Sequence, residues 1–141
     1  IKAAQYVRLK SLTNPLWVEA MVTQIKRQKF FRWHDAGDIQ SMDHLNKIFE
    51  VCRLTPQIQH WMPTREAQFL TQVKPEEGPK NLIIRMSSHM IDQAAVKFWP
   101  WTSTVTSKGG ASCPAPSQNN TCGDCRACWN RGSSNVSYGK H

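Results

Sequence analysis

Apolar and polar residues follow one another in short blocks along this chain, and the spacing within a block changes from helical to extended. Residues 14–28 place apolar side chains at near-helical spacing, and Asn14 followed by Pro15 suits the start of a helix. Residues 42–54 repeat this spacing behind Ser41, which can cap the helix. The pattern predicts helices over both ranges, and a shorter helix over residues 66–73.

Short apolar runs without alternation lie between and after these helices. They cover residues 29–33, 57–62 and 81–86, and residues 103–106 form a fourth candidate. Strands that are buried on both faces have this pattern, and a helix between two strands allows them to run parallel. We therefore expect an α/β fold of parallel strands with helical crossovers, shaped as part of a barrel or as a small open sheet.

The pattern ends near residue 107. The remaining residues are rich in Gly, Ser, Pro and Cys and have neither a helical nor an extended period. Because such a segment has no apolar face to bury, something other than a core must hold it. We therefore divide the chain into an α/β domain, residues 1–107, and a cysteine-rich metal-binding tail, residues 108–141, that packs on it.

The cysteines of this tail have the spacing of ligands to one metal centre. Four of the five cysteines lie there, at Cys113, Cys122, Cys125 and Cys128. Three thiolates at two-residue intervals, with a distant Cys-Pro, are familiar from sites that hold a [4Fe-4S] cluster. Zinc sites more often pair two separate Cys-x2-Cys units. The spacing slightly favours the iron–sulfur cluster; zinc and unliganded thiols stay open, as does His89 or His141 as one ligand.

Chemically capable side chains follow each expected strand. In parallel α/β folds these strand ends meet at one face and form the site. We expect general acid–base or nucleophilic chemistry from His34, Asp35, Asp38 and Glu66. We expect an anionic substrate to be bound by Arg65, Arg85 and Ser87. The alternatives are turn chemistry for the loop and local ion pairs for the arginines.

The charge of the chain favours an anionic partner. Eighteen basic and ten acidic residues leave a formal net charge of +8. Nucleic acid is the simplest such partner, although the same charge can serve only to keep a surface solvated. No apolar run approaches the ~20 residues that cross a bilayer, and no signal peptide is recognisable. We therefore expect a cytoplasmic protein without membrane contact.

Three motifs in order resemble the phage gene product 88 family. They are Phe-Arg-Trp-His-Asp-Ala-Gly-Asp-Ile-Gln-Ser over residues 31–41, Trp-Met-Pro-Thr-Arg-Glu over residues 61–66, and the cysteine segment with the final Val-Ser-Tyr-Gly-Lys-His. The resemblance implies a phage or prophage protein in the host bacterial cytoplasm. It also implies that members carry a further N-terminal segment, which we expect this sequence to lack. It implies no particular chemistry.

Three functions are compatible with these observations. The first is a metal- or Fe-S-binding protein that acts on nucleic acid or nucleotides, in its most specific form as a base-modifying enzyme. The second is a non-enzymatic, zinc-stapled module that binds nucleic acid or a phage or host protein. The third is a phage structural or assembly component with a large exposed apolar surface. Convergence of the predicted site residues in one pocket would favour an enzyme, and their separation a binding module.

Overall fold

The computed structural model describes residues 2–34 and 37–140. The helices are α1 (Lys2–Ser11), α2 (Trp17–Ile25), α3 (Met42–Leu54) and α4 (Ala67–Leu70). The strands are β1 (Phe30–Arg32), β2 (Gln59–Thr64), β3 (Leu82–Ser87), β4 (Thr102–Thr106) and β5 (Asn135–Gly139). Short 3-10 turns lie at η1 (Pro75–Glu77), η2 (Ala115–Gln118) and η3 (Ala127–Trp129).

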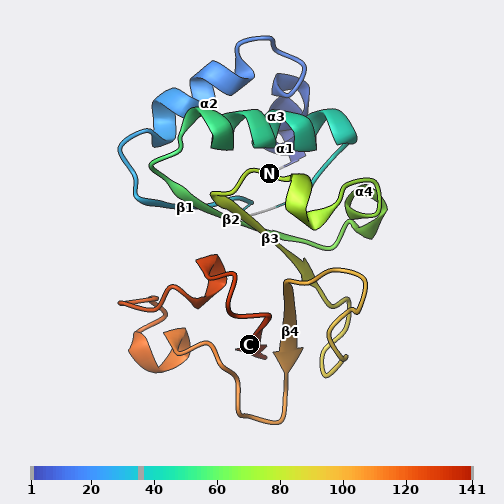
Figure 1. Cartoon of the computed structure of the whole chain (residues 1–141), viewed down its shortest axis with the longest axis vertical. Helices are drawn as coiled ribbons and strands as arrows, with labels where there is room; N and C mark the ends of the chain where they lie inside the picture. The colour runs from blue at the N-terminus through green and yellow to red at the C-terminus, as the bar shows by residue number, and fades with distance from the viewer. Residues whose placement is uncertain (1, 35–36, 141) are drawn as a thin grey trace.

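Within the described ranges, the five strands form one sheet in the order β1-β2-β3-β4-β5, and every neighbouring pair is parallel. The order in the sheet is therefore the order in the chain. The sheet curls into half a barrel, with helices along it (Figure 1). This confirms the predicted α/β class and its parallel strands, and of the two shapes that we expected the sheet has the partial barrel.

Two elements were not expected from the sequence. Helix α1 has no consistent apolar face, and Tyr6, Val7 and Leu9 are exposed on it. Strand β5 reads Asn-Val-Ser-Tyr-Gly and buries only Val136 fully, yet it pairs with β4 along its whole length. Helix α2 begins later than predicted because the side chain of Asn14 accepts a hydrogen bond from the Leu16 amide at 2.9 Å and holds a turn there, and it ends three residues earlier, at Ile25.

Different parts of the chain pack on the two faces of the sheet. Leu82, Ile84 and Met86 belong to the main hydrophobic core, whereas Arg85 between them bonds the C-terminal segment. Side chains of a strand alternate between faces, so the core and Arg85 lie on opposite sides. Figure 1 shows the same division, with the helices on one side of the sheet and the orange-to-red C-terminal segment on the other.

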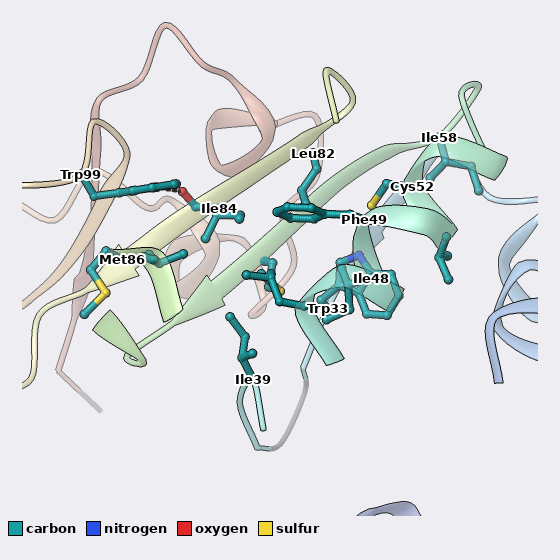
Figure 2. Close-up of a cluster of buried hydrophobic side chains, with 14 of the residues drawn as sticks. Trp33, Ile39, Ile48, Phe49, Cys52, Ile58, Leu82, Ile84, Met86 and Trp99 are labelled. Atoms are coloured by element: carbon teal, nitrogen blue, oxygen red, sulfur yellow. Dashed lines mark hydrogen bonds between the residues drawn. The ribbon is translucent and has the colours of Figure 1, made fainter. Parts of the chain in front are cut away.

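Helix α3 supplies most of the helix side of the core. Its side chains Ile48, Phe49 and Cys52 pack against β3, the strand that carries Leu82 and Ile84 (Figure 2). The helix begins as predicted at Met42, because the hydroxyl of Ser41 accepts a hydrogen bond from the His44 amide at 3.0 Å. Burying side chains of this size contributes about 1.5–3 kcal/mol each.

Trp99 closes the core at its end near β3. It is buried, and its indole nitrogen donates a hydrogen bond to the Ile84 carbonyl at 2.8 Å, drawn as a dashed line in Figure 2. Trp101 lies against Trp99 with ring centroids 6.3 Å apart. The Trp99-Pro100-Trp101 sequence therefore serves packing. In the described residues no helix is both long and apolar enough to span a membrane.

Candidate functional site

A pocket of about 770 Å³ lies beyond the C-terminal end of β1. Its walls come from α1, α2, the loop that joins β1 to α3, and the first turn of α3. Trp17 and Met21 supply apolar surface, and His34, Asp38 and His44 supply polar groups. A pocket of this size and position is typical of small-molecule sites at the strand ends of α/β proteins.

His34 carries three signs of a functional residue. Its φ angle of 61° lies in the left-handed region, which a residue with a side chain adopts at a cost. Its Nε2 atom is buried and has no hydrogen-bond partner among the described residues. Burial lowers the pKa of the imidazole, and the charge of Asp38 opposes this only in part. A neutral imidazole at the pocket can therefore serve as a general base.

His44 is a pocket residue that the sequence interpretation did not include. Its ring centroid lies 5.6 Å from that of His34, and its Nδ1 accepts a hydrogen bond from the Gln40 amide at 3.1 Å. In the neutral ring the proton therefore lies on Nε2. Burial, followed by the charges of His34 and Lys47, lowers its pKa to about 4. The signal in the sequence was its place three residues after the cap Ser41, where a side chain reaches back over the preceding loop.

Asp38 ties the loop to the end of β2. Its Oδ1 accepts hydrogen bonds from the Ile39 amide at 2.7 Å and from the Thr64 hydroxyl, and its Oδ2 accepts one from the Arg65 amide at 2.8 Å. These bonds occupy the carboxylate and fix the position of the loop that carries His34. Asp35, which we also expected to be catalytic, lies outside the described residues.

The other predicted site residues do not gather at this pocket. Glu66 accepts a hydrogen bond from the Gln68 side chain at 3.1 Å, and the Arg65 side chain is exposed. The Ser87 and Ser103 hydroxyls bond one another at 2.8 Å. Of the predicted catalytic and substrate-binding residues that the structure describes, His34 and Asp38 alone line the pocket.

Arg85, expected as a substrate clamp, is buried with no exposed surface and holds the C-terminal segment to the sheet. Burial lowers the pKa of its guanidinium. All three of its nitrogens donate to main-chain carbonyls, at 2.9 to 3.4 Å: those of Thr102, Ala127, Cys128, Asn130 and Ser134. A fork of several donors in a fixed plane suits such a set of acceptors, which Lys cannot match.

The segment that Arg85 holds has almost no core of its own. None of residues 104–135, all of which the structure describes, is buried. Two further side chains fix it to the sheet. The Trp129 indole nitrogen donates to the Phe31 carbonyl at 3.2 Å, and Arg131 donates to the Leu82 carbonyl at 3.0 Å. Polar bonds to strands, rather than apolar burial, position this part of the chain.

Cys113 and Cys122 lie close enough to Cys128 to affect it electrostatically. The Cys128 sulfur lies 3.0 Å from the Tyr138 hydroxyl oxygen. Burial raises the pKa of the Cys128 thiol most, and the charges of Cys113 and Cys122 act in the same direction. Cys125 follows on a turn closed by its amide and the Cys122 carbonyl at 3.0 Å.

All five cysteines are free thiols, and Cys52 lies in the core on α3. Among the described residues, no group of three or more His, Cys, Asp or Glu side chains is arranged so that it could hold a metal ion. Predicted ligation by the four tail cysteines therefore stays a prediction.

The family model described as Gene product 88 matches residues 1–131. No curated protein and no solved structure matches the chain. The matched range contains the pocket loop, strands β1 to β4 and the four tail cysteines. The chain belongs to the gene product 88 family.

Proposed function

We propose that this protein binds nucleic acid and that one four-thiolate metal centre organises the C-terminal segment that takes part in binding. The observation that carries the proposal is the absence of any buried residue from 104 to 135, a range that the structure describes in full. A segment of that length loses much conformational entropy when it is ordered. Metal binding offsets this loss in small cysteine-rich units, because its free energy becomes folding energy.

The positions of the cysteines support this centre. The Cys113 amide donates to the Ser137 carbonyl at 2.9 Å, which puts this residue beside β5 and near Cys128. Cys122 is exposed, and the other three are half-buried, so a metal can reach them from solvent. Without a metal, burial raises the pKa of the Cys128 thiol and favours its neutral form. A bound cation reverses that preference and draws thiolates together.

The charge supports nucleic acid as the partner. The chain has a formal net charge of +8, and the only ion pair among the described residues joins Lys47 and Asp43 at 3.3 Å. Most cationic side chains are therefore available to an anion. Phosphate contacts of this kind supply most of the affinity in sequence-independent nucleic-acid binding.

A binding protein also accounts for the separated site residues. Asp38 is committed to the end of β2, Glu66 to Gln68, and Arg85 to the opposite face of the sheet. An enzyme that used all of them would need them in one pocket. Their separation favours the binding module over the enzyme.

Metal analysis tests the centre directly. Protein purified without oxygen should contain one metal centre per chain. Iron with labile sulfide and a brown colour would identify a [4Fe-4S] cluster, whereas one zinc without colour would identify a zinc staple. Cys125→Ser should lose the metal, and the matched variant Cys52→Ala should keep it because Cys52 lies in the core. Metal-free protein with a fully ordered tail would refute the centre.

One observation favours a second function, an enzyme that modifies bases or nucleotides. His34 combines a strained backbone, a buried Nε2 without a partner in the described ranges and a place at the strand-end pocket. Such sites are where catalytic residues gather. Saturation-transfer NMR with the common nucleoside monophosphates should show binding that His34→Gln removes and His89→Gln, at an exposed site, leaves intact. Equal binding by both variants would dismiss this function.

A further inference from the structure

We propose that the Arg–aromatic surface, composed of Phe30, Arg32, Trp61, Arg126 and Trp129, binds single-stranded nucleic acid by stacking against unpaired bases. This surface lies on the tail side of the sheet, away from the His34 pocket, and no predicted site residue belongs to it. The inference rests on the proposed nucleic-acid function and names the strand form and the residues that serve it.

The sheet supplies one half of this surface. Phe30 and Arg32 are two residues apart on β1, an edge strand, so both point to the same side of the sheet. Trp61 pairs with Arg32 on β2, and the Arg32 guanidinium lies 4.9 Å from the centroid of the Trp61 ring. Phe31 and Trp33, which point the other way, pack against the helix-side core.

The cysteine segment supplies the other half. Trp129 lies edge-on to Phe30 and to Trp61, with ring centroids 5.5 and 5.3 Å apart. The Arg126 guanidinium lies 4.6 Å from the centroid of Phe30. Arg126 stands between Cys125 and Cys128, and Trp129 follows Cys128 directly. The fold of the cysteine segment therefore decides whether this surface exists.

Both arginines have unused capacity for an anion. Nη1 of Arg126 donates to the Gly123 and Cys125 carbonyls, each at 2.8 Å, which leaves Nε and Nη2 without partners in the part of the chain that is described. Arg32 has no hydrogen bond or ion pair there, and both side chains are exposed. Guanidinium groups that are stacked on rings and free of carboxylates suit phosphate oxygens.

A hollow beside these rings offers room for a base. It measures about 480 Å³ and is bordered by Phe30, Trp129 and Arg126 together with the polar residues Gln59 and Asn130. Phe30 is 37% exposed, so a ligand in this hollow can contact it. The Gln59 amide has no side-chain partner in the described ranges and can meet the edge of a base.

The chemistry favours single strands over duplexes. Aromatic rings with neighbouring arginines stack on any exposed base, whereas a duplex hides its base faces. An apolar protein partner would not explain two arginines without acidic partners. Trp61 is buried and 6% exposed, so it supports Arg32 and Trp129 by packing rather than by meeting a base itself.

Fluorescence anisotropy with fluorescein-labelled 12-mers of dT and of A-rich RNA, and with a duplex of equal length, tests the inference. The full chain with its metal complement should prefer both single strands. Phe30→Ala should weaken binding roughly 5- to 150-fold, as removal of one stacked base does, and Phe30→Tyr should restore it. Arg32→Gln and Arg126→Gln should each weaken binding and lower the dependence of log affinity on log salt by about 0.7 for each phosphate that the variant no longer neutralises.

Arg53→Gln is the matched control. Arg53 is exposed, lies 5.8 Å from the centroid of Phe49 and sits on α3, on the other side of the sheet. It should bind as the unchanged protein does. Equally weakened binding by Arg53→Gln and Arg32→Gln, full binding by Phe30→Ala, or equal affinity for the duplex would overturn the inference. Metal content measured on the same samples separates the two proposals. Nucleic-acid binding that Phe30→Ala, Arg32→Gln and Arg126→Gln leave unchanged sinks this surface alone, and metal-loaded protein without any binding sinks the proposed nucleic-acid function with it. Binding by metal-free protein sinks the metal centre alone.

Discussion

Five main-chain carbonyls from the cysteine segment and β4 converge on the guanidinium of Arg85, which no water reaches. A buried charge is costly unless hydrogen bonds surround it, and here they come from the backbone rather than from a carboxylate. The sequence identified Arg85 as a chemically capable residue at a strand end, but it predicted a substrate clamp. The partners are carbonyls 17 to 49 residues away, and no local pattern indicates them.

Replacing Arg85 should therefore destabilise the protein severely. Arg85→Met removes the charge but leaves five carbonyls without their donor, so we expect the free energy of unfolding to fall by at least about 3 kcal/mol. Urea unfolding followed by tryptophan fluorescence measures it. Arg65→Met, at an exposed side chain, is the control and should change stability by less than about 0.5 kcal/mol. A similar midpoint for both variants would contradict the role given to Arg85.

Buried histidines should make stability depend on pH. His44 and His60 are almost fully buried, and burial lowers the pKa of each from 6.5 to about 4. The Nδ1 atom of His60 accepts a hydrogen bond from the Trp33 indole at 3.1 Å. Protonation of Nδ1 would therefore place two N–H donors opposite each other and break this bond. Between these pKa values the unfolded chain binds more protons than the folded one, and stability therefore rises with pH across that window.

The expected result is full stability above about pH 6.5 and a decrease on the order of 3 kcal/mol for each histidine as the pH falls to about 4. Urea midpoints at a series of pH values measure this. His44→Asn, which keeps an acceptor for the Gln40 amide, should flatten the profile, and His89→Asn at an exposed site should not. Equal profiles for the two variants would contradict the burial-driven shift.

At the scale of elements, predictability follows local signals. Helix α3 was predicted over its observed range because a cap, an apolar face and a Thr-Pro stop coincide there. β2 and β3 each contain three consecutive apolar residues, 61–63 and 82–84, and their ends were predicted to within two residues. β5 was not predicted because it is stabilised by pairing with β4, whose paired residues come more than thirty positions earlier in the chain. Of its own residues only Val136 is buried.

The N-terminal cap of α3 contributes a measurable part of the unfolding free energy. Ser41→Ala removes the acceptor for the His44 amide and should cost about 1 kcal/mol of unfolding free energy. Because the same helix carries His44 toward the pocket, the substitution should also disturb the wall of that site. Ser41→Asp, which restores an acceptor, should recover the stability in the same urea titration. If Ser41→Ala is as stable as the unchanged chain, the cap does not set the start of α3.

At the scale of the molecule, one sheet has two unlike faces. The helix side is packed by an apolar core that the sequence pattern predicted in large part, including Ile48, Phe49 and Ile84. The other side is covered by a segment without buried residues from 104 to 135, every one of them described, and it is joined to the strands by Arg85, Arg131 and Trp129. Two sides of different physical character allow one side to unfold while the other stays intact.

The cysteine segment was predicted because the sequence has no apolar period there. The sequence did not predict the Arg–aromatic surface that this segment completes. Trp129 and Phe30 are 99 residues apart, and their contact depends on β1 being the edge strand. Long-range contacts of this kind are absent from any window of the sequence. They emerge only when the strand order is known.

Hydrogen–deuterium exchange of the purified protein, before and after removal of its metal, tests the central claim most directly. With the metal present, amides of residues 112–130 should exchange slowly at their hydrogen-bonded positions, such as Cys113 and Cys125. After removal these amides should exchange at nearly the rate of an unfolded chain, while β2 and β3 keep their protection. Identical exchange in both states, or a purified protein that never contained metal and still protects this range, would contradict the account.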